Sequence, residues 1–157
     1  MKKYILFILI VSALFYTSGQ TYEEQSLIPT LKHWLPNKPF NNFLSMFQIP
    51  YWGGIVSIDE RGYYLFIEFL IRKGAQIITF SALAISAFIM TKRYFLSLFI
   101  TLVIAVIDEF HQSFTGGRTP TVQDVLLDAI GAIFALLTIF VLKYVHSHKK
   151  SRLYKQT

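Results

Sequence analysis

Four carboxylates, one histidine and one arginine interrupt two apolar runs in AVIDEFHQSFTGGRTPTVQDVLLDAIGA, residues 105–132. Ionisable groups in such surroundings are costly unless they lie at a membrane boundary, satisfy one another or do chemistry. The imidazole of His111 has the unperturbed pKa closest to neutrality, and Asp108 one helical turn earlier could fix its tautomer. The candidate catalytic residues are therefore His111, Asp108 and Glu109.

Three cations near this segment suggest a binding site as an alternative. Arg72, Lys73 and Arg118 could together clamp a phosphate or carboxylate group of a headgroup-like ligand. His111 and Gln112 lie three and four residues after Asp108, so these side chains share a helix face, and we include Gln112 among the candidate ligand-binding residues. This interpretation predicts binding of an anionic ligand without requiring its chemical transformation.

A third interpretation treats the same charges as a structural network. Glu68 and Arg72 are four residues apart, a favourable pair on a helix, and Thr121 with Asp124 resembles a capping box. Asp128 lies within an apolar run and needs a cationic partner such as Arg72 or Arg118. The residues that we assign to this polar network are Glu68, Gln76, Asp124 and Asp128.

Metal binding is a weaker alternative for the same region. Glu109, His111 and Asp128 could ligate a hard or borderline divalent ion, but their spacing is weak evidence for such a site. The chain has no cysteine, which excludes disulfides and thiolate metal sites. We predict no metal and no cofactor.

The elements that must position these residues are membrane-spanning helices. Of the 157 residues, 54% are hydrophobic and 17% aromatic, which is typical of a membrane protein. Apolar stretches predict an all-α fold with four spans at about 4–22, 66–91, 94–114 and 120–142. The N-terminal stretch also fits a signal peptide, but its length and the absence of an A-x-A site favour a span. We expect one transmembrane domain over residues 1–145 and a basic cytoplasmic tail over 146–157.

The formal charge of +6 indicates a topology rather than a nucleic-acid partner. With Lys2 and Lys3 inside, four spans return the C-terminus to the cytoplasm, and the segments predicted to be cytoplasmic carry no carboxylate. This distribution follows the positive-inside rule. The cations on that side are Lys2, Lys3, Lys92, Arg93, Lys143, Lys149, Lys150, Arg152 and Lys155.

An extracytoplasmic segment rich in aromatic residues, from 21 to 62, joins the first two spans. Tryptophan and tyrosine favour the headgroup region, so LSMFQIPYWGG (44–54) is expected on the outer leaflet or folded back over the helix ends. It serves either as a structural lid or as a surface that contacts substrate. In the fourth span, Gly131 and Ala135 continue the stripe of Asp124 and Asp128 and would let another helix approach closely.

The segment DEFHQSFTGGRTPTVQDVLLDAIGA (108–132) resembles the signature of the VanZ-like family of small bacterial membrane proteins. The family signature looks like D-E-x-H-Q, followed in order by G-R, D-V and D-x-x-G. Weaker similarity extends to FYTSGQ (15–20) and to FIEFLIRKGAQ (66–76), so the resemblance covers most of the chain. Gln76 stands where the family often has a histidine, which puts a two-histidine metal site or proton relay in doubt.

The resemblance implies a role at the bacterial cell envelope, since the family's namesake is associated with low-level resistance to the glycopeptide teicoplanin. Our leading hypothesis is a protein that binds an anionic envelope lipid or lipid-linked glycan through Arg72, Lys73 and Arg118. The alternatives are an outer-leaflet enzyme with His111 as general acid or base, and a structural or assembly protein without a catalytic site. Membrane lipids or lipid-linked precursors are the expected partners, and homo-oligomerisation is left open.

Overall fold

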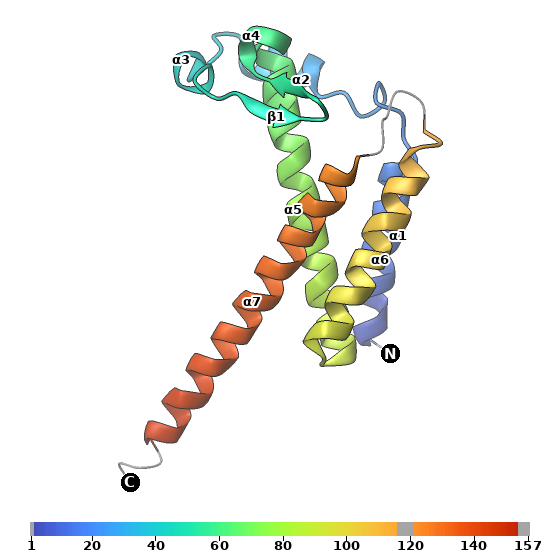
Figure 1. Cartoon of the computed structure of the whole chain (residues 1–157), viewed down its shortest axis with the longest axis vertical. Helices are drawn as coiled ribbons and strands as arrows, with labels where there is room; N and C mark the ends of the chain where they lie inside the picture. Colours follow the sequence, from blue (N-terminus) through green and yellow to red (C-terminus); the bar gives the residue numbers. More distant parts are fainter. Residues whose placement is uncertain (1, 116–120, 154–157) are drawn as a thin grey trace.

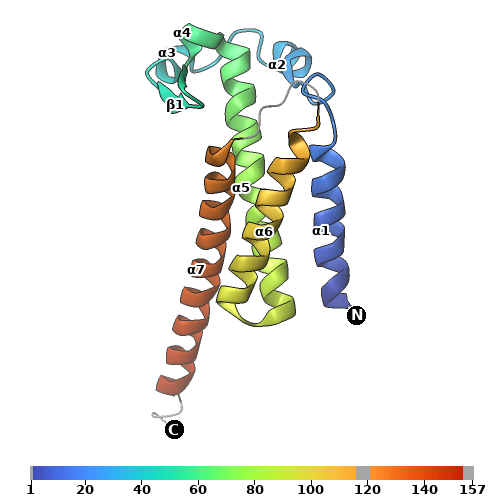
Figure 2. The ribbon, with the colours of Figure 1, turned by 45° about the vertical axis from the view of Figure 1, so that its right-hand side comes forward.

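Long helices dominate the computed structural model, which describes residues 2–115 and 121–153. The four longest are α1 (Lys2–Ser18), α5 (Tyr63–Thr91), α6 (Tyr94–Gln112) and α7 (Val122–Leu153). Figures 1 and 2 show these helices side by side, with the N-terminus, the α5–α6 turn and the C-terminal part of α7 at one end. A helix satisfies its backbone hydrogen bonds internally, which a lipid environment requires.

Three of these helices are long and apolar enough to cross a membrane: α5, α6 and residues 122–148 of α7, with 29, 19 and 27 residues. The helix α1 is apolar but has only 17 residues and ends at Ser18, four residues before the predicted end of the first span. The helix α7 continues to Leu153, so the predicted tail is helical at its start. The predicted start of the fourth span, at residue 120, lies outside the described residues.

Helix α5 lies at the centre and packs against α1, α6 and α7. It lies close to α7 at Gly131, where an added Cβ would lie 2.7 Å from the Ile77 carbonyl oxygen. The Ser81 hydroxyl donates to the Gly131 carbonyl across this contact, at 2.9 Å. The predicted close approach at Gly131 is therefore confirmed, because only glycine leaves room for the α5 backbone.

The segment before α5 folds into short elements over the N-terminal end of that helix (Figure 1). They are α2 (Ile28–Trp34), α3 (Asn41–Leu44), β1 (Ile49–Tyr51), β2 (Gly54–Val56) and α4 (Ile58–Arg61). The antiparallel β1–β2 hairpin pairs Ile49 with Val56, so the all-α prediction missed a small two-stranded sheet. Trp52 and Gly53 form its turn with φ values of 52° and 69°, as a two-residue turn of type I′ requires.

Large apolar side chains remain exposed on this segment. The ring of Trp52 at the hairpin turn is 55% exposed, and Trp34 at the end of α2 is 73% exposed. Such side chains favour the headgroup region of a bilayer. The exposed large hydrophobic residues between α2 and the hairpin turn are Trp34, Phe40, Phe43, Met46, Phe47 and Trp52.

Candidate functional site

An ion pair between α5 and α7 forms the centre of the candidate site. The Lys73 ammonium contacts Asp124 Oδ1 and donates a further hydrogen bond to Gln76 Oε1 at 3.0 Å. Asp124 is buried in the first turn of α7, where the helix dipole favours a carboxylate. The predicted ligand-binding residue Lys73 and the predicted network residues Gln76 and Asp124 thus meet in one cluster.

The tip of the β1–β2 hairpin covers this cluster. The Tyr51 hydroxyl donates to Asp124 Oδ1, and its ring centroid lies 4.7 Å from the Lys73 Nζ. The next backbone N–H, that of Trp52, donates to Gln123 Oε1 at 2.6 Å. Burial and the hydrogen bond to Asp124 raise the pKa of Tyr51, so its hydroxyl remains a donor at neutral pH.

Arg72 lies in a second cluster, with Glu68. The guanidinium donates to Glu68 Oε1 at 2.6 and 3.0 Å, which confirms the helical pair predicted from their spacing. Arg72 also donates to the side-chain oxygen of Gln25 at 3.0 Å and to its backbone carbonyl at 2.9 Å. Glu68 Oε1 further accepts the Leu27 N–H at 3.2 Å. This cluster fastens the chain around residues 25–27 to the start of α5.

Glu109 forms part of the cap of α7. It is only 6% exposed, and its Oε1 accepts the backbone N–H of Thr121 at 2.5 Å. The Thr121 hydroxyl in turn accepts the N–H of Asp124 at 3.0 Å, which is one arm of the predicted capping box. The Asp124 carboxylate contacts Tyr51 and Lys73 instead of completing the box. Glu109 therefore links the end of α6 to the start of α7.

His111 has a different partner from the predicted one. Its Nδ1 lies 3.0 Å from the Ser18 hydroxyl, at the end of α1, and the Phe15 ring packs edge-on against the imidazole. Asp108 accepts a hydrogen bond from the Gln112 amide at 2.7 Å. The histidine thus joins α1 to α6, and the tautomer of its ring is coupled to Ser18.

Asp128 is a buried carboxylate on α7, one turn after Asp124. It is 1% exposed, and its Oδ1 has no hydrogen-bond partner among the described residues. Arg72, one of its two predicted partners, is bound to Glu68, and the other, Arg118, falls outside the described part of the chain. The carboxylates of Asp124, Asp108 and Glu109 all interact electrostatically with Asp128. The cation Lys73 also interacts electrostatically with Asp128 and opposes this repulsion.

Four contact residues were missed by the sequence interpretation: Ser18, Gln25, Tyr51 and Gln123. Ser18 lies within the FYTSGQ motif, which could have marked it. The run Tyr51, Trp52, Gly53, Gly54 carries the turn signal of a hairpin, but its docking on α7 is a long-range contact without a local signal. Among residues 2–115 and 121–153, no group of three or more candidate ligands is arranged to hold a metal ion.

Comparison with known proteins gives one family. The model of the VanZ/LLP1 family matches residues 3–143, which include every described residue of the two clusters. No curated protein and no solved structure matches the chain.

Proposed function

The chain belongs to the VanZ/LLP1 family, and we propose that it is a bacterial cell-envelope protein that binds a lipid or lipid-linked glycan at the outer end of its helices. In this proposal α1 is a fourth span beside the three long apolar helices. Its 17 residues correspond to about 26 Å of helix, slightly less than a hydrocarbon core of about 30 Å. The hydrogen bond from α1 to α6 through Ser18 and His111 supports this position.

The distribution of charge supports a topology with both termini in the cytoplasm. Lys92 and Arg93 lie in the α5–α6 turn, at the same end as the N-terminus (Figure 1). Lys143 lies towards that end on α7. The paired carboxylates Glu68 and Asp124 lie near the N-terminal ends of α5 and α7, at the other end of the molecule. Cations on the cytoplasmic side agree with the positive-inside rule.

The docking of the hairpin on the start of α7 is the observation that carries the binding proposal. Hydrogen bonds from Tyr51 to Asp124 and from Trp52 to Gln123 fix the hairpin tip at the first turn of α7. The exposed Trp52 ring is therefore held where α7 enters the bilayer, one residue from the side chain that contacts Lys73. An aromatic surface beside a polar cluster suits a ligand with a headgroup or sugar on an acyl chain.

An anionic ligand at Arg72 or Lys73 would have to displace the protein oxygens that these two cations contact. Arg72 makes five hydrogen bonds, to Glu68 and to the chain at residues 22 and 25, whereas Lys73 is held by Asp124 and Gln76. Lys73 is therefore the cation from which a phosphate or carboxylate could more easily displace a protein oxygen. In the proposal, the ligand anion takes the place of Asp124 at Lys73, and Arg118 adds a second charge.

The family's association with teicoplanin resistance provides the cellular test. A host that expresses the chain should be less susceptible to teicoplanin, and Lys73→Gln should lose more of this protection than any fall in its membrane abundance explains. The exposed residue Lys32 of α2 is the matched control, because Lys32→Gln removes the same charge outside both clusters. Equal protection by all variants, or no protection by the wild type, would contradict a resistance role for this site.

The internal pairing of Arg72 and Lys73 favours a second candidate, a structural or assembly protein in which the polar clusters hold helices together. That candidate predicts that Lys73→Gln and Asp128→Asn reduce membrane abundance in proportion to any loss of phenotype. The enzyme alternative predicts instead that His111→Gln abolishes activity in a protein that folds normally. Abundance measured alongside susceptibility separates these outcomes.

A further inference from the structure

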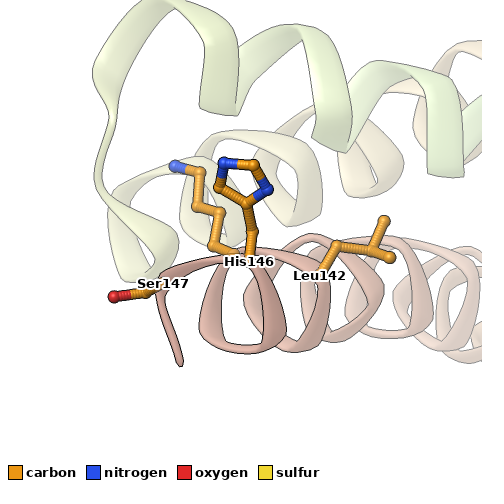
Figure 3. Close-up of a pocket in the computed structure, with 4 residues that line it drawn as sticks. Leu142, His146 and Ser147 are labelled. Carbon is orange, nitrogen blue, oxygen red and sulfur yellow. The ribbon is translucent and has the colours of Figure 1, made fainter. Parts of the chain in front are cut away.

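A groove lies on the C-terminal part of α7, towards the end of the molecule opposite the outer segment. It has a volume of about 620 Å³ and is lined by Leu142, Lys143, His146 and Ser147. Figure 3 shows the His146 ring directed away from the axis of α7, with Leu142 one turn earlier on the helix. All four lining residues are exposed, so the groove is open to the surroundings of the helix and is not an enclosed cavity.

Aromatic rings from α5 and α6 lie beside the lysine of this groove. Lys143 Nζ lies 4.3 Å from the ring centroid of Phe88 on α5 and 6.0 Å from that of Tyr94 on α6. The Phe88 and Tyr94 rings are 4.5 Å apart, and Tyr94 packs edge-on against Phe140 of α7 at 5.9 Å. A cation over ring faces is attracted to them, so the ammonium is positioned without being neutralised.

The charge near the groove is uncompensated. The two ion pairs found in the described structure involve Arg72 and Lys73, and Lys143 takes part in neither. Lys92 and Arg93 in the α5–α6 turn add further positive charge at this end of the helices. The last carboxylate in the sequence is Asp128, fifteen residues before Lys143. A lysine at a membrane boundary is stabilised by an anionic partner, which this part of the protein does not supply.

We propose that this groove binds the phosphate of an anionic phospholipid in the adjacent leaflet. Lys143 supplies the charge, His146 and Ser147 supply a ring N–H and a hydroxyl as donors, and Leu142 contacts the first part of an acyl chain. Basic pockets between transmembrane helices are suited to such headgroups. The site is separate from the proposed outer site, and only its assignment to the cytoplasmic leaflet depends on the proposed topology.

Binding of dioleoylphosphatidylglycerol to the purified full chain tests the proposal. Native mass spectrometry of a lipid titration gives the affinity, and the thermal unfolding midpoint without lipid shows whether each variant is folded. Loss of one charge-assisted contact predicts about tenfold weaker binding by Lys143→Gln, whereas Lys143→Arg retains most of the affinity. Lys92→Gln removes the same charge at the same end of the helices, from a residue that does not line the groove, and should change the affinity by less than about twofold.

Several outcomes would overturn the proposal. Equal losses in Lys143→Gln and Lys92→Gln would mean that the lipid responds to total charge and not to the groove. Equally tight binding of dioleoylphosphatidylcholine would exclude selection for an anionic headgroup. Inorganic phosphate that displaces the lipid at similar concentration would show that a free anion, and not a lipid, is the ligand. None of these results bears on teicoplanin susceptibility, so failure here is distinct from failure of the outer-site function.

Discussion

Lys73 of α5 and Asp124 of α7 form an ion pair directly beneath the tip of the β1–β2 hairpin. This pair connects two long helices and also provides the acceptor for Tyr51, so the outer segment and the helices are fastened at one point. A ligand that reaches Lys73 must therefore loosen the hairpin or replace its contacts. Stability and binding are coupled at this position.

Removal of the lysine from this pair should destabilise the protein. Lys73→Met leaves a buried carboxylate without its cation, and we expect the free energy of unfolding to fall by about 1–3 kcal/mol. In Lys73→Met with Asp124→Asn the carboxylate is also gone, so the double variant should be more stable than the sum of the single effects predicts. Thermal unfolding in a fixed detergent, analysed as a double-mutant cycle, measures the coupling. Strict additivity would show that the pair contributes nothing.

Two glycines offer a matched test of the α5–α7 contact. Gly131→Ala places a methyl group 2.7 Å from the Ile77 carbonyl oxygen, which should cost about 1–3 kcal/mol or separate the helices. Gly74→Ala on α5 meets no atom within 4 Å and should stabilise the helix by about 0.5–1 kcal/mol. Unfolding midpoints of the two variants should thus move in opposite directions. A neutral Gly131→Ala would contradict the close packing.

Alkaline pH should weaken the attachment of the hairpin. Burial, together with the hydrogen bond to Asp124, raises the pKa of Tyr51 in the folded protein above its ordinary value of 10.0. The stability that this group contributes is therefore complete below pH 10 and is lost as the pH rises through the folded-state pKa. The unfolding midpoint of the wild type should fall more steeply above pH 10 than that of Tyr51→Phe. Parallel curves would exclude Tyr51 as the cause.

The backbone of Trp52 predicts a stabilising substitution. A residue other than glycine at positive φ is unfavourable, and asparagine tolerates this region better than tryptophan. Trp52→Asn should therefore slow amide exchange of the N–H that donates to Gln123, while Trp34→Asn, in a helix, should leave it unchanged. Faster exchange in Trp52→Asn would show that ring contacts, and not the turn, hold the hairpin.

The long helices were largely predictable from the sequence because apolar stretches and backbone hydrogen bonding act locally. Composition predicts the three long helices that contain Phe80, Ala105 and Ala132. Small-residue spacing predicts the close approach at Gly131. Helix ends were less predictable, since α1 ends at Ser18 where a turn begins, and α7 continues beyond the apolar stretch.

The partners of the site residues were less predictable, because they depend on contacts between distant segments. Arg72 and Glu68 are neighbours on one helix, and their pairing was predicted correctly. The contact of His111 with Ser18 joins residues 93 positions apart, and that of Tyr51 with Asp124 joins residues 73 positions apart. Spacing within one helix favoured Asp108 as the histidine's partner, but the packing of α1 against α6 brings Ser18 there instead.

Photocrosslinking in native membranes tests the central claim, that the hairpin end of the protein selects an envelope lipid or lipid-linked glycan. A photoreactive amino acid replaces Trp52 at the hairpin or, as control, the exposed residue Phe99 in the middle of α6. Mass spectrometry then identifies the adducts. We predict that position 52 captures a lipid species enriched over the bulk membrane, while position 99 captures the bulk mixture. The same mixture at both positions would contradict selective binding at the hairpin.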